Sequence, residues 1–229
     1  MAFSIVIKDK TFNSLEQIGK EMYLYPEAFE KVLTSRKFLL ILKQEDEEKF
    51  NKLIEYNQLY RDVNAFLFYA QYLFCPHMEL KYHRHKFDSL KKLGEYIIYN
   101  GPSIDVYTKD LLKLNLLSKY MKDQGLDKKN PKIYDEVLYL ERLSIENENR
   151  AYFLLGFRLS ECDKIIYDKK EYDSVKDFFK TMTSDYYLYK FSSGLENDQY
   201  VYSWLIVKGY EDVITKYRGL IDTIEEMEK

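Results

Sequence analysis

A short alternation of apolar and polar positions, followed by an aromatic residue and a polar pair, occurs three times along the chain. The copies are IVIKDKTFNSLEQIG at 5–19, LKYHRHKFDSLKKLG at 80–94 and, more loosely, IIYDKKEYDSVKDFF at 165–179. Aligned on Phe12, Phe87 and Tyr172, they are separated by 75 and 85 residues. A period of this length predicts a repeating unit that contains several helices.

Each copy predicts the same local structure. Apolar side chains at Ile5 and Ile7, or at Leu80 and Tyr82, alternate with polar ones, which is typical of a short strand. A polar turn and a brief return strand follow, and the return strand ends at the aromatic residue. Asn or Asp and then Ser come next, and both residue types cap helix N-termini. We therefore expect a β-hairpin followed by a capped helix in each copy.

Longer apolar patterns predict the remaining helices. They are expected at 13–24, 26–42 and 50–74, then at 88–99, 104–122, 131–145 and 148–160, with an amphipathic terminal helix at 210–228. In 26–42, Phe29, Leu33 and Leu40 are expected to point inward. In 50–74, one inward face is expected to carry Leu59, Val63, Phe66, Ala70 and Leu73. In the second copy Gly156 replaces Ala70, which predicts a close helix–helix contact there.

The fold class that follows is mainly α with short β-hairpins (α+β), arranged as three tandem related units. The units are expected at 1–79, 80–164 and 165–229, within one continuous domain. The third unit is shortened, and its segment 185–194 matches none of the expected elements. An atypical last unit is expected where a stack of repeats must end in a polar surface.

Charge and cysteine content narrow the class of protein. The net charge of −3 and the pI of about 5.8 argue against binding to nucleic acid by bulk electrostatics. Cys75 and Cys162 occupy near-equivalent repeat positions, and we interpret them as buried thiols in a reducing compartment. The sequence has no apolar run of membrane-spanning length and no leader-like segment, so a cytoplasmic protein is expected.

Aromatic residues crowd the irregular third unit. Tyrosine offers a large contact area at low side-chain entropy cost and is enriched at the centres of protein interfaces. A partner-binding surface is therefore expected there, although the same rings could fill the end of the core. The candidate residues are Tyr186, Tyr187, Tyr189, Phe191, Tyr200 and Tyr202.

The turn of the second copy is basic and offers an alternative function. Cationic side chains beside an aromatic ring can hold an RNA backbone and stack a base. The candidate nucleic-acid-binding residues are Lys81, Tyr82, His83, Arg84, His85 and Lys86. A solvated hairpin tip explains the same pattern, and the acidic balance of the whole chain favours that interpretation.

A third hypothesis is a metal-dependent enzyme at Cys75, His77, His83 and His85, since thiolate and imidazole suit zinc. Their spacing matches no common zinc module, and the corresponding turn residues of the other copies, Asp9 and Asp168 among them, do not continue the pattern. No nucleophile–base ordering, glycine-rich phosphate loop or paired-carboxylate motif stands out. We therefore predict no metal, no cofactor and no catalytic residues.

The run F/Y-[ND]-S-[LV]-x-x-[LIF]-G behind a strand resembles helical repeat modules of large bacterial proteins. The likeness covers most of the first two units and weakens after residue 180. The size and the Lys/Tyr bias also resemble small bacterial or phage inhibitors of the anti-CRISPR type. These resemblances imply a non-enzymatic protein that docks on a larger bacterial effector or ribonucleoprotein.

Overall fold

A computed structural model of the chain describes residues 3–101, 106–167, 169–180 and 198–210. Within these ranges the chain is mainly helical and contains three small antiparallel sheets of two strands each. The predicted class, mainly α with short β-hairpins, is confirmed. The segment 185–194 and all but the first residue of the predicted terminal helix lie outside the described residues.

All three predicted hairpins form with the same register. Their strands are β1 (Ile5–Ile7) and β2 (Lys10–Phe12), β3 (Leu80–Tyr82) and β4 (His85–Phe87), and β5 (Ile165–Tyr167) and β6 (Lys170–Tyr172). In each sheet the first residue of the first strand lies opposite the aromatic residue that ends the second. Both turn residues of the first two hairpins have positive φ, as two-residue loops that follow the strand twist require.

A capped helix follows each hairpin, as the sequence predicts. The helices are α1 (Leu15–Glu21), α6 (Leu90–Asn100) and α12 (Val175–Lys180). The hydroxyl of the preceding serine accepts the backbone N–H three residues on: Gln17 for Ser14, Lys92 for Ser89 and Asp177 for Ser174. Each cap satisfies an amide that the first turn of a helix otherwise leaves unpaired.

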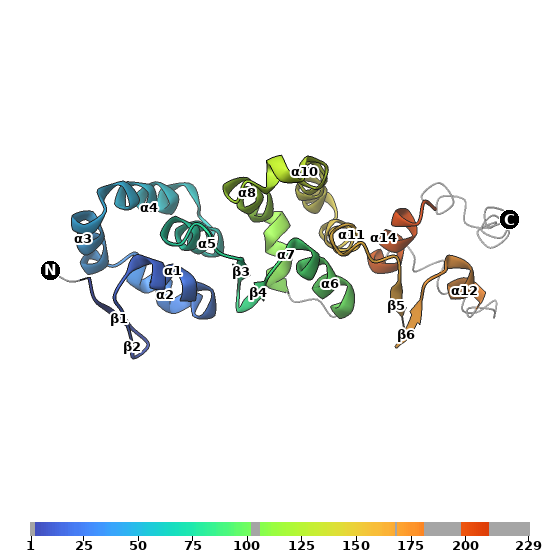
Figure 1. The fold of residues 1–229 in the computed structure, drawn as a ribbon, viewed down its shortest axis with the longest axis horizontal. Coiled ribbons are helices and arrows are strands. Elements are labelled where there is room, and N and C mark those ends of the chain that lie inside the picture. The colour runs from blue at the N-terminus through green and yellow to red at the C-terminus, as the bar shows by residue number, and fades with distance from the viewer. Residues whose placement is uncertain (1–2, 102–105, 168, 181–197, 211–229) are drawn as a thin grey trace. The chain divides into compact units, whose positions relative to one another are not determined.

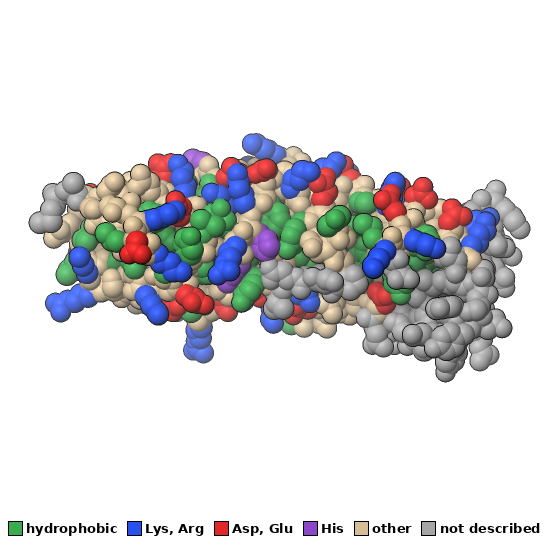
Figure 2. All heavy atoms as spheres, turned by 90° about the horizontal axis from the view of Figure 1, so that it is seen from below, with side chains coloured by type: hydrophobic (Ala, Val, Ile, Leu, Met, Phe, Trp, Pro, Cys, Tyr) green, Lys and Arg blue, Asp and Glu red, His purple; other side chains and the backbone are tan. Residues whose placement is uncertain are grey.

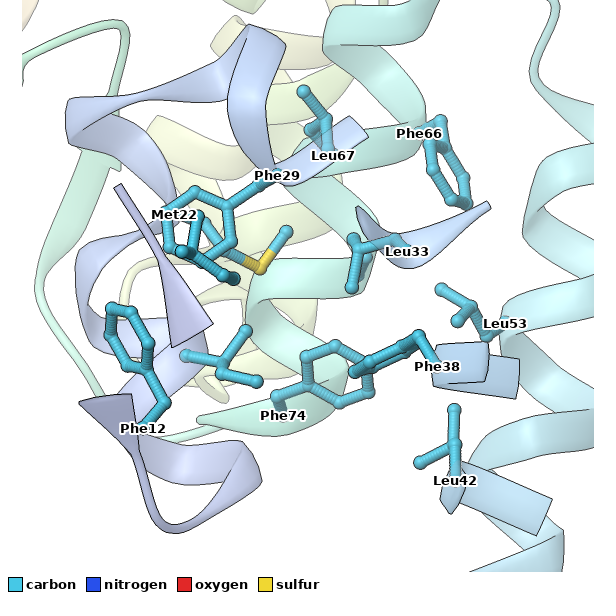
Figure 3. Close-up of a cluster of buried hydrophobic side chains, with 13 residues drawn as sticks. Phe12, Met22, Phe29, Leu33, Phe38, Leu42, Leu53, Phe66, Leu67 and Phe74 are labelled. Carbon is cyan, nitrogen blue, oxygen red and sulfur yellow. The ribbon is translucent and has the colours of Figure 1, made fainter. Parts of the chain in front are cut away.

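The chain divides into two compact units, and the first comprises Met1–Asp88 and Leu116–Lys129. Besides β1–β4 and α1 it contains the short 3₁₀ helix η1 (Met22–Leu24), α2 (Pro26–Leu33), α3 (Arg36–Glu45), α4 (Glu47–Leu59), α5 (Val63–Phe74), α8 (Leu116–Asp123) and α9 (Leu126–Lys129). Its core gathers side chains from the first hairpin and helices α1–α5 (Figure 3). Phe12 meets Phe29 edge to face with 5.7 Å between ring centroids. Burying each such ring contributes about 1.5–3 kcal/mol.

The second unit comprises Ser89–Asn115 and Asn130–Lys229. Its described helices are α6, α7 (Val106–Lys113), α10 (Pro131–Glu146), α11 (Glu148–Ser160), α12 and α14 (Gln199–Val207). Helix α11 packs against α6, α10 and α14 (Figure 1), and all its side chains from Ala151 to Phe157 are buried. A Cβ at Gly156 would lie 2.5 Å from Ile97 Cγ2 of α6, so the predicted close contact is confirmed.

Three helices that the sequence predicts as continuous are interrupted. The segment 26–42 forms α2 and α3, because the Ser35 hydroxyl accepts the Phe38 N–H and starts a new helix. The segment 50–74 forms α4 and α5, because an Asp62 carboxylate oxygen accepts the N–H groups of Asn64 and Ala65. The segment 104–122 is broken between α7 and α8, where Asn115 has a φ of 54°.

These interruptions change which side chains face the core. Leu40, Leu59 and Val63 were expected to point inward, but they are 53%, 61% and 40% exposed. Of the other predicted inward residues, Phe29, Leu33, Phe66 and Ala70 are buried, and Leu73 is half-buried. The error for Leu59 and Val63 follows from the break, because a helical face cannot continue through the extended backbone at Tyr60 and Asp62.

Both cysteines are free thiols; Cys75 is buried as predicted, and Cys162 is half-buried. Within the described part of the chain, no helix combines the length and the apolar character that crossing a membrane needs.

The limits of the two compact units differ from those of the predicted sequence repeats. The division of the sequence into repeats at residues 79 and 164 stays a prediction.

Candidate functional site

A cleft of about 470 Å³ lies in the first unit. Residues of α4, α5 and α8 line it, together with Asp46, which precedes α4, and Pro76, which follows α5. We call it the tyrosine cleft, because Tyr56, Tyr69 and Tyr72 contribute to its wall. The other lining residues are Asp46, Glu48, Lys49, Lys52, Leu73, Pro76, Lys119 and Asp123.

The aromatic wall is held in place by ring contacts. Tyr60 stacks on Tyr69 with 4.0 Å between centroids and 9° between planes, and Tyr56 lies 5.4 Å from Tyr69. Tyr72 lies 5.3 Å from Tyr120 of α8. Tyr69 and Tyr72 share one face of α5 because they are three residues apart. Rings packed against each other lose little further freedom when a ligand covers them.

The charges of the tyrosine cleft are paired within it. Lys49 Nζ lies 2.6 Å from Asp46 Oδ2, Lys52 Nζ lies 2.6 Å from Glu48 Oε1, and Lys119 pairs with Asp123. Lys119 Nζ also lies 5.6 Å from the centroid of the Tyr69 ring, which is within cation–π range. Three cations and three carboxylates leave the lining with no net charge.

The hydroxyls of Tyr56 and Tyr72 stay protonated at neutral pH. Burial, and then the negative charge of Asp123, raise the pKa of Tyr56 above its ordinary value. Burial likewise raises the pKa of Tyr72. Hydrogen bonds from Lys49 lower the pKa of Asp46, which therefore keeps its charge. The Tyr72 hydroxyl already bonds the Glu79 carbonyl and the Lys81 N–H. The cleft thus offers the Tyr56 hydroxyl, aromatic rings and compensated charges, which suit polar peptide groups better than a phosphate chain.

Sequence reasoning did not find this cleft. In the predicted helix 50–74, Tyr69 and Tyr72 lie off the expected inward face, and a second apolar face on a helix needs a covering element. The acid–lysine pairs at spacings of three and four were a further signal of an ordered helix surface. Nothing local relates these residues to Lys119, which lies about fifty residues further along the chain.

The predicted partner-binding aromatics are only partly described. Tyr186, Tyr187, Tyr189 and Phe191 lie outside the described residues. Tyr200 is 1% exposed, and its hydroxyl donates to the Ile98 carbonyl, so it serves the core rather than an exposed surface. Tyr202 is half-buried, and the guanidinium of Arg150 lies 4.3 Å from its ring centroid.

The predicted basic turn makes many contacts within its own unit. Lys81 Nζ donates to the Lys20 carbonyl at 3.2 Å and lies over the Tyr23 ring, and His83 Nε2 is 2.7 Å from Asn64 Oδ1. Lys86 Nζ lies 3.3 Å from carboxylates of both Glu79 and Asp88.

The other residues of the turn differ in exposure. Tyr82 is 4% exposed, which removes its ring from base stacking in this conformation. Arg84 is exposed, His85 is half-buried, and the His85 ring stacks at 6.0 Å on Phe87. An RNA-binding role for this turn stays a prediction.

The remaining hypothesis concerned a metal at Cys75, His77, His83 and His85. In the described ranges, no three side chains of His, Cys, Asp or Glu come together in a way that could hold a metal ion. His83 bonds Asn64 instead, and burial raises the pKa of Cys75, which disfavours the thiolate that zinc binds.

The described surface carries both signs of charge. Figure 2 shows lysine, arginine and acidic side chains interspersed over one face of the molecule, with hydrophobic side chains between them. Comparisons of the chain with protein-family models, with curated proteins and with solved structures find no significant match.

Proposed function

We propose that this chain is a non-enzymatic protein-binding module, and that the tyrosine cleft holds a segment of a larger protein or ribonucleoprotein. The observation that carries the proposal is the combination of packed tyrosine rings with fully compensated charges in one concave site. Tyrosine-lined, charge-compensated surfaces are favourable for peptide groups, because aromatic area can be covered without leaving an ion unpaired.

Photo-crosslinking tests the proposal at the site itself. A benzoylphenylalanine at position 56 keeps an aromatic side chain in the cleft and reacts with any segment that lies there. The matched control is the same residue at position 139, because Tyr139 is 50% exposed on α10 in the second unit. We expect a protein adduct from position 56 that survives nuclease treatment, and no such adduct from position 139. Equal labelling at both positions, or adducts that nuclease removes, would contradict the proposal.

The aromatics of the third unit are the competing partner surface. Placing the same crosslinker at Tyr187 and at Tyr202 compares that surface with the cleft in one experiment. Adducts from these positions and none from position 56 would place the binding site in the third unit. The protein-binding function would then still hold, but the tyrosine cleft would not be its site.

The resemblance to anti-CRISPR inhibitors supplies the first partner class to test. We propose that the larger partner is a bacterial RNA-guided nuclease or a comparable effector. We expect that adding the wild-type chain abolishes DNA cleavage by the nuclease. A chain with Lys119→Glu should leave cleavage intact. This substitution leaves Asp123 without its cation and reverses a charge in the cleft. Unchanged cleavage with wild-type chain excludes the tested nuclease as the partner.

A further inference from the structure

Each of the three hairpins is a two-stranded sheet, so its first strand has an outer backbone edge without a strand neighbour. In a two-residue hairpin the pair beside the turn exchanges both of its hydrogen bonds, and the next pair does not. The middle residue of the first strand, Val6, Lys81 or Ile166, therefore directs its N–H and C=O groups away from the second strand. These outward groups need another partner.

In the second hairpin, α5 supplies that partner. The Lys81 N–H donates to the Tyr72 hydroxyl at 3.0 Å, and the Gln71 amide donates to the Lys81 carbonyl at 2.8 Å. The Tyr72 hydroxyl in turn donates to the Glu79 carbonyl at 3.0 Å. One Gln-Tyr pair on an apolar helix thus covers the whole outer edge of β3.

The third hairpin uses the same chemistry from a different helix. The Ile166 N–H donates to the Tyr200 hydroxyl of α14 at 3.3 Å, and that hydroxyl donates to the Ile98 carbonyl at 3.2 Å. Tyr72 precedes its hairpin in the chain and Tyr200 follows its hairpin. The shared feature is therefore the tyrosine hydroxyl on the outward amide, independent of chain order.

The first hairpin has no such cover among the described residues. Val6 is 64% exposed, and neither a side chain nor another backbone group of the described chain bonds its N–H or C=O. The burial of the preceding residue agrees with this difference: Leu80 and Ile165 are 1% and 0% exposed, while Ile5 is half-buried. Phe3, two residues before Ile5, is also half-buried.

We propose that the outer edge of β1 is a docking surface for an apolar helix of the α5 type that another chain supplies. A tyrosine of that helix accepts the Val6 N–H, a neighbouring side-chain amide donates to the Val6 carbonyl, and the apolar side chains around the tyrosine cover Ile5 and Phe3. This surface is separate from the tyrosine cleft, so either site can exist without the other.

Amide exchange of the full chain, followed by NMR, tests the surface with a defined probe. The probe is a synthetic peptide of residues 62–79 with Cys75→Ser and added lysines for solubility. In the free chain we expect the Val6 amide to exchange at least about ten-fold faster than the Lys81 and Ile166 amides, which donate to hydroxyls. Saturating peptide should slow the Val6 amide by about ten-fold, and the peptide with Tyr72→Phe should not.

Variants of the chain provide a second measurement. Val6→Pro removes the outward N–H at an edge position where the strand ladder does not use it, and Val6→Thr keeps that N–H. We expect the proline variant to bind the fluorescent peptide about ten-fold more weakly and the threonine variant to bind it normally. Equal protection of Val6 and Lys81 in the free chain overturns the proposal. Protection by a strand peptide of residues 4–12 but not by the helix peptide also overturns it, because the occupant is then a strand.

Discussion

At the scale of single residues, buried tyrosine hydroxyls take over hydrogen bonds that a wider sheet would otherwise make. Tyr72 and Tyr200 each accept an outward strand amide and donate to a carbonyl. A phenol can do both only while it is protonated. Burial raises the pKa of both hydroxyls, that of Tyr200 to about 12, so their protonated form is favoured by the fold.

The raised pKa of Tyr200 predicts a loss of stability at alkaline pH. An unfolded tyrosine ionises near pH 10, while Tyr200 in the folded chain ionises near pH 12. The contribution is fully present below pH 10, and it is lost as the pH rises through about 12, because the unfolded chain releases its proton first. Two pKa units correspond to at most about 2.7 kcal/mol.

Urea unfolding between pH 9 and 12 measures this contribution. We expect Tyr200→Phe to cost about 1–2 kcal/mol at pH 8, because the Ile166 amide and the Ile98 carbonyl lose their partner. The variant should also show a smaller decline of stability with pH. Tyr202→Phe is the control, since Tyr202 is half-buried. An unchanged pH slope in Tyr200→Phe would show that this hydroxyl is not the titrating group.

At the scale of elements, the structure confirms the predictions that depend only on residues close together in the sequence. The hairpin pairs lie at most seven residues apart and the serine caps three, so the pattern from Ile5 to Gln17 sufficed to predict them. The break between α4 and α5 at Asp62 is also set by local residues. The apolar side chains on both sides of it continue a helical pattern, so the sequence predicted one helix instead of two. The tyrosine cleft could not be predicted, because the ring of Tyr69 meets Lys119 through tertiary packing alone.

Two of the repeated helices approach a partner helix at a glycine. A Cβ at Gly94 of α6 would lie 2.4 Å from the Ser160 backbone nitrogen and 2.8 Å from the Leu159 carbonyl carbon. A Cβ at Gly19 of α1 would lie 2.8 Å from the Gln71 carbonyl oxygen in α5. The third copy has the buried Phe179 at this position, so α12 does not repeat the close approach through a glycine.

We therefore expect Gly94→Ala to destabilise the second unit by about 3 kcal/mol, because the backbone of α11 cannot yield as a side chain can. The higher helix propensity of alanine offsets only about 1 kcal/mol. Lys91→Ala on the exposed side of α6 is the control and should change stability by less than about 0.5 kcal/mol. Urea unfolding followed by circular dichroism compares the three proteins. A Gly94→Ala protein as stable as wild type would mean that α6 and α11 lie further apart than described.

At the scale of the whole molecule, the boundaries of the predicted sequence repeats differ from those of the two compact units. The predicted first repeat ends at residue 79, whereas the first compact unit also includes the second hairpin and residues 116–129. The second hairpin contributes the bonds of Lys81 to Gln71 and Tyr72, and its Tyr82 ring lies 5.9 Å from that of Phe68. A repeat that relies on the following repeat to complete its core is typical of tandem arrays.

This overlap predicts that a fragment of residues 1–79 does not fold as the first unit does. It lacks β3, and it lacks Tyr120 of α8, whose ring packs against Tyr72. The fragment therefore exposes Phe68 and Tyr72, which are 3% and 6% exposed in the full chain. We expect a urea midpoint well below that of the full chain, or no cooperative transition at all. A fragment of residues 1–129, which contains every residue of the first unit, is the control and should keep the transition of that unit. If the fragment of residues 1–79 unfolded at the midpoint of the control, each sequence repeat would be self-sufficient, and the contacts of Tyr72 with the second hairpin would contribute little to its stability.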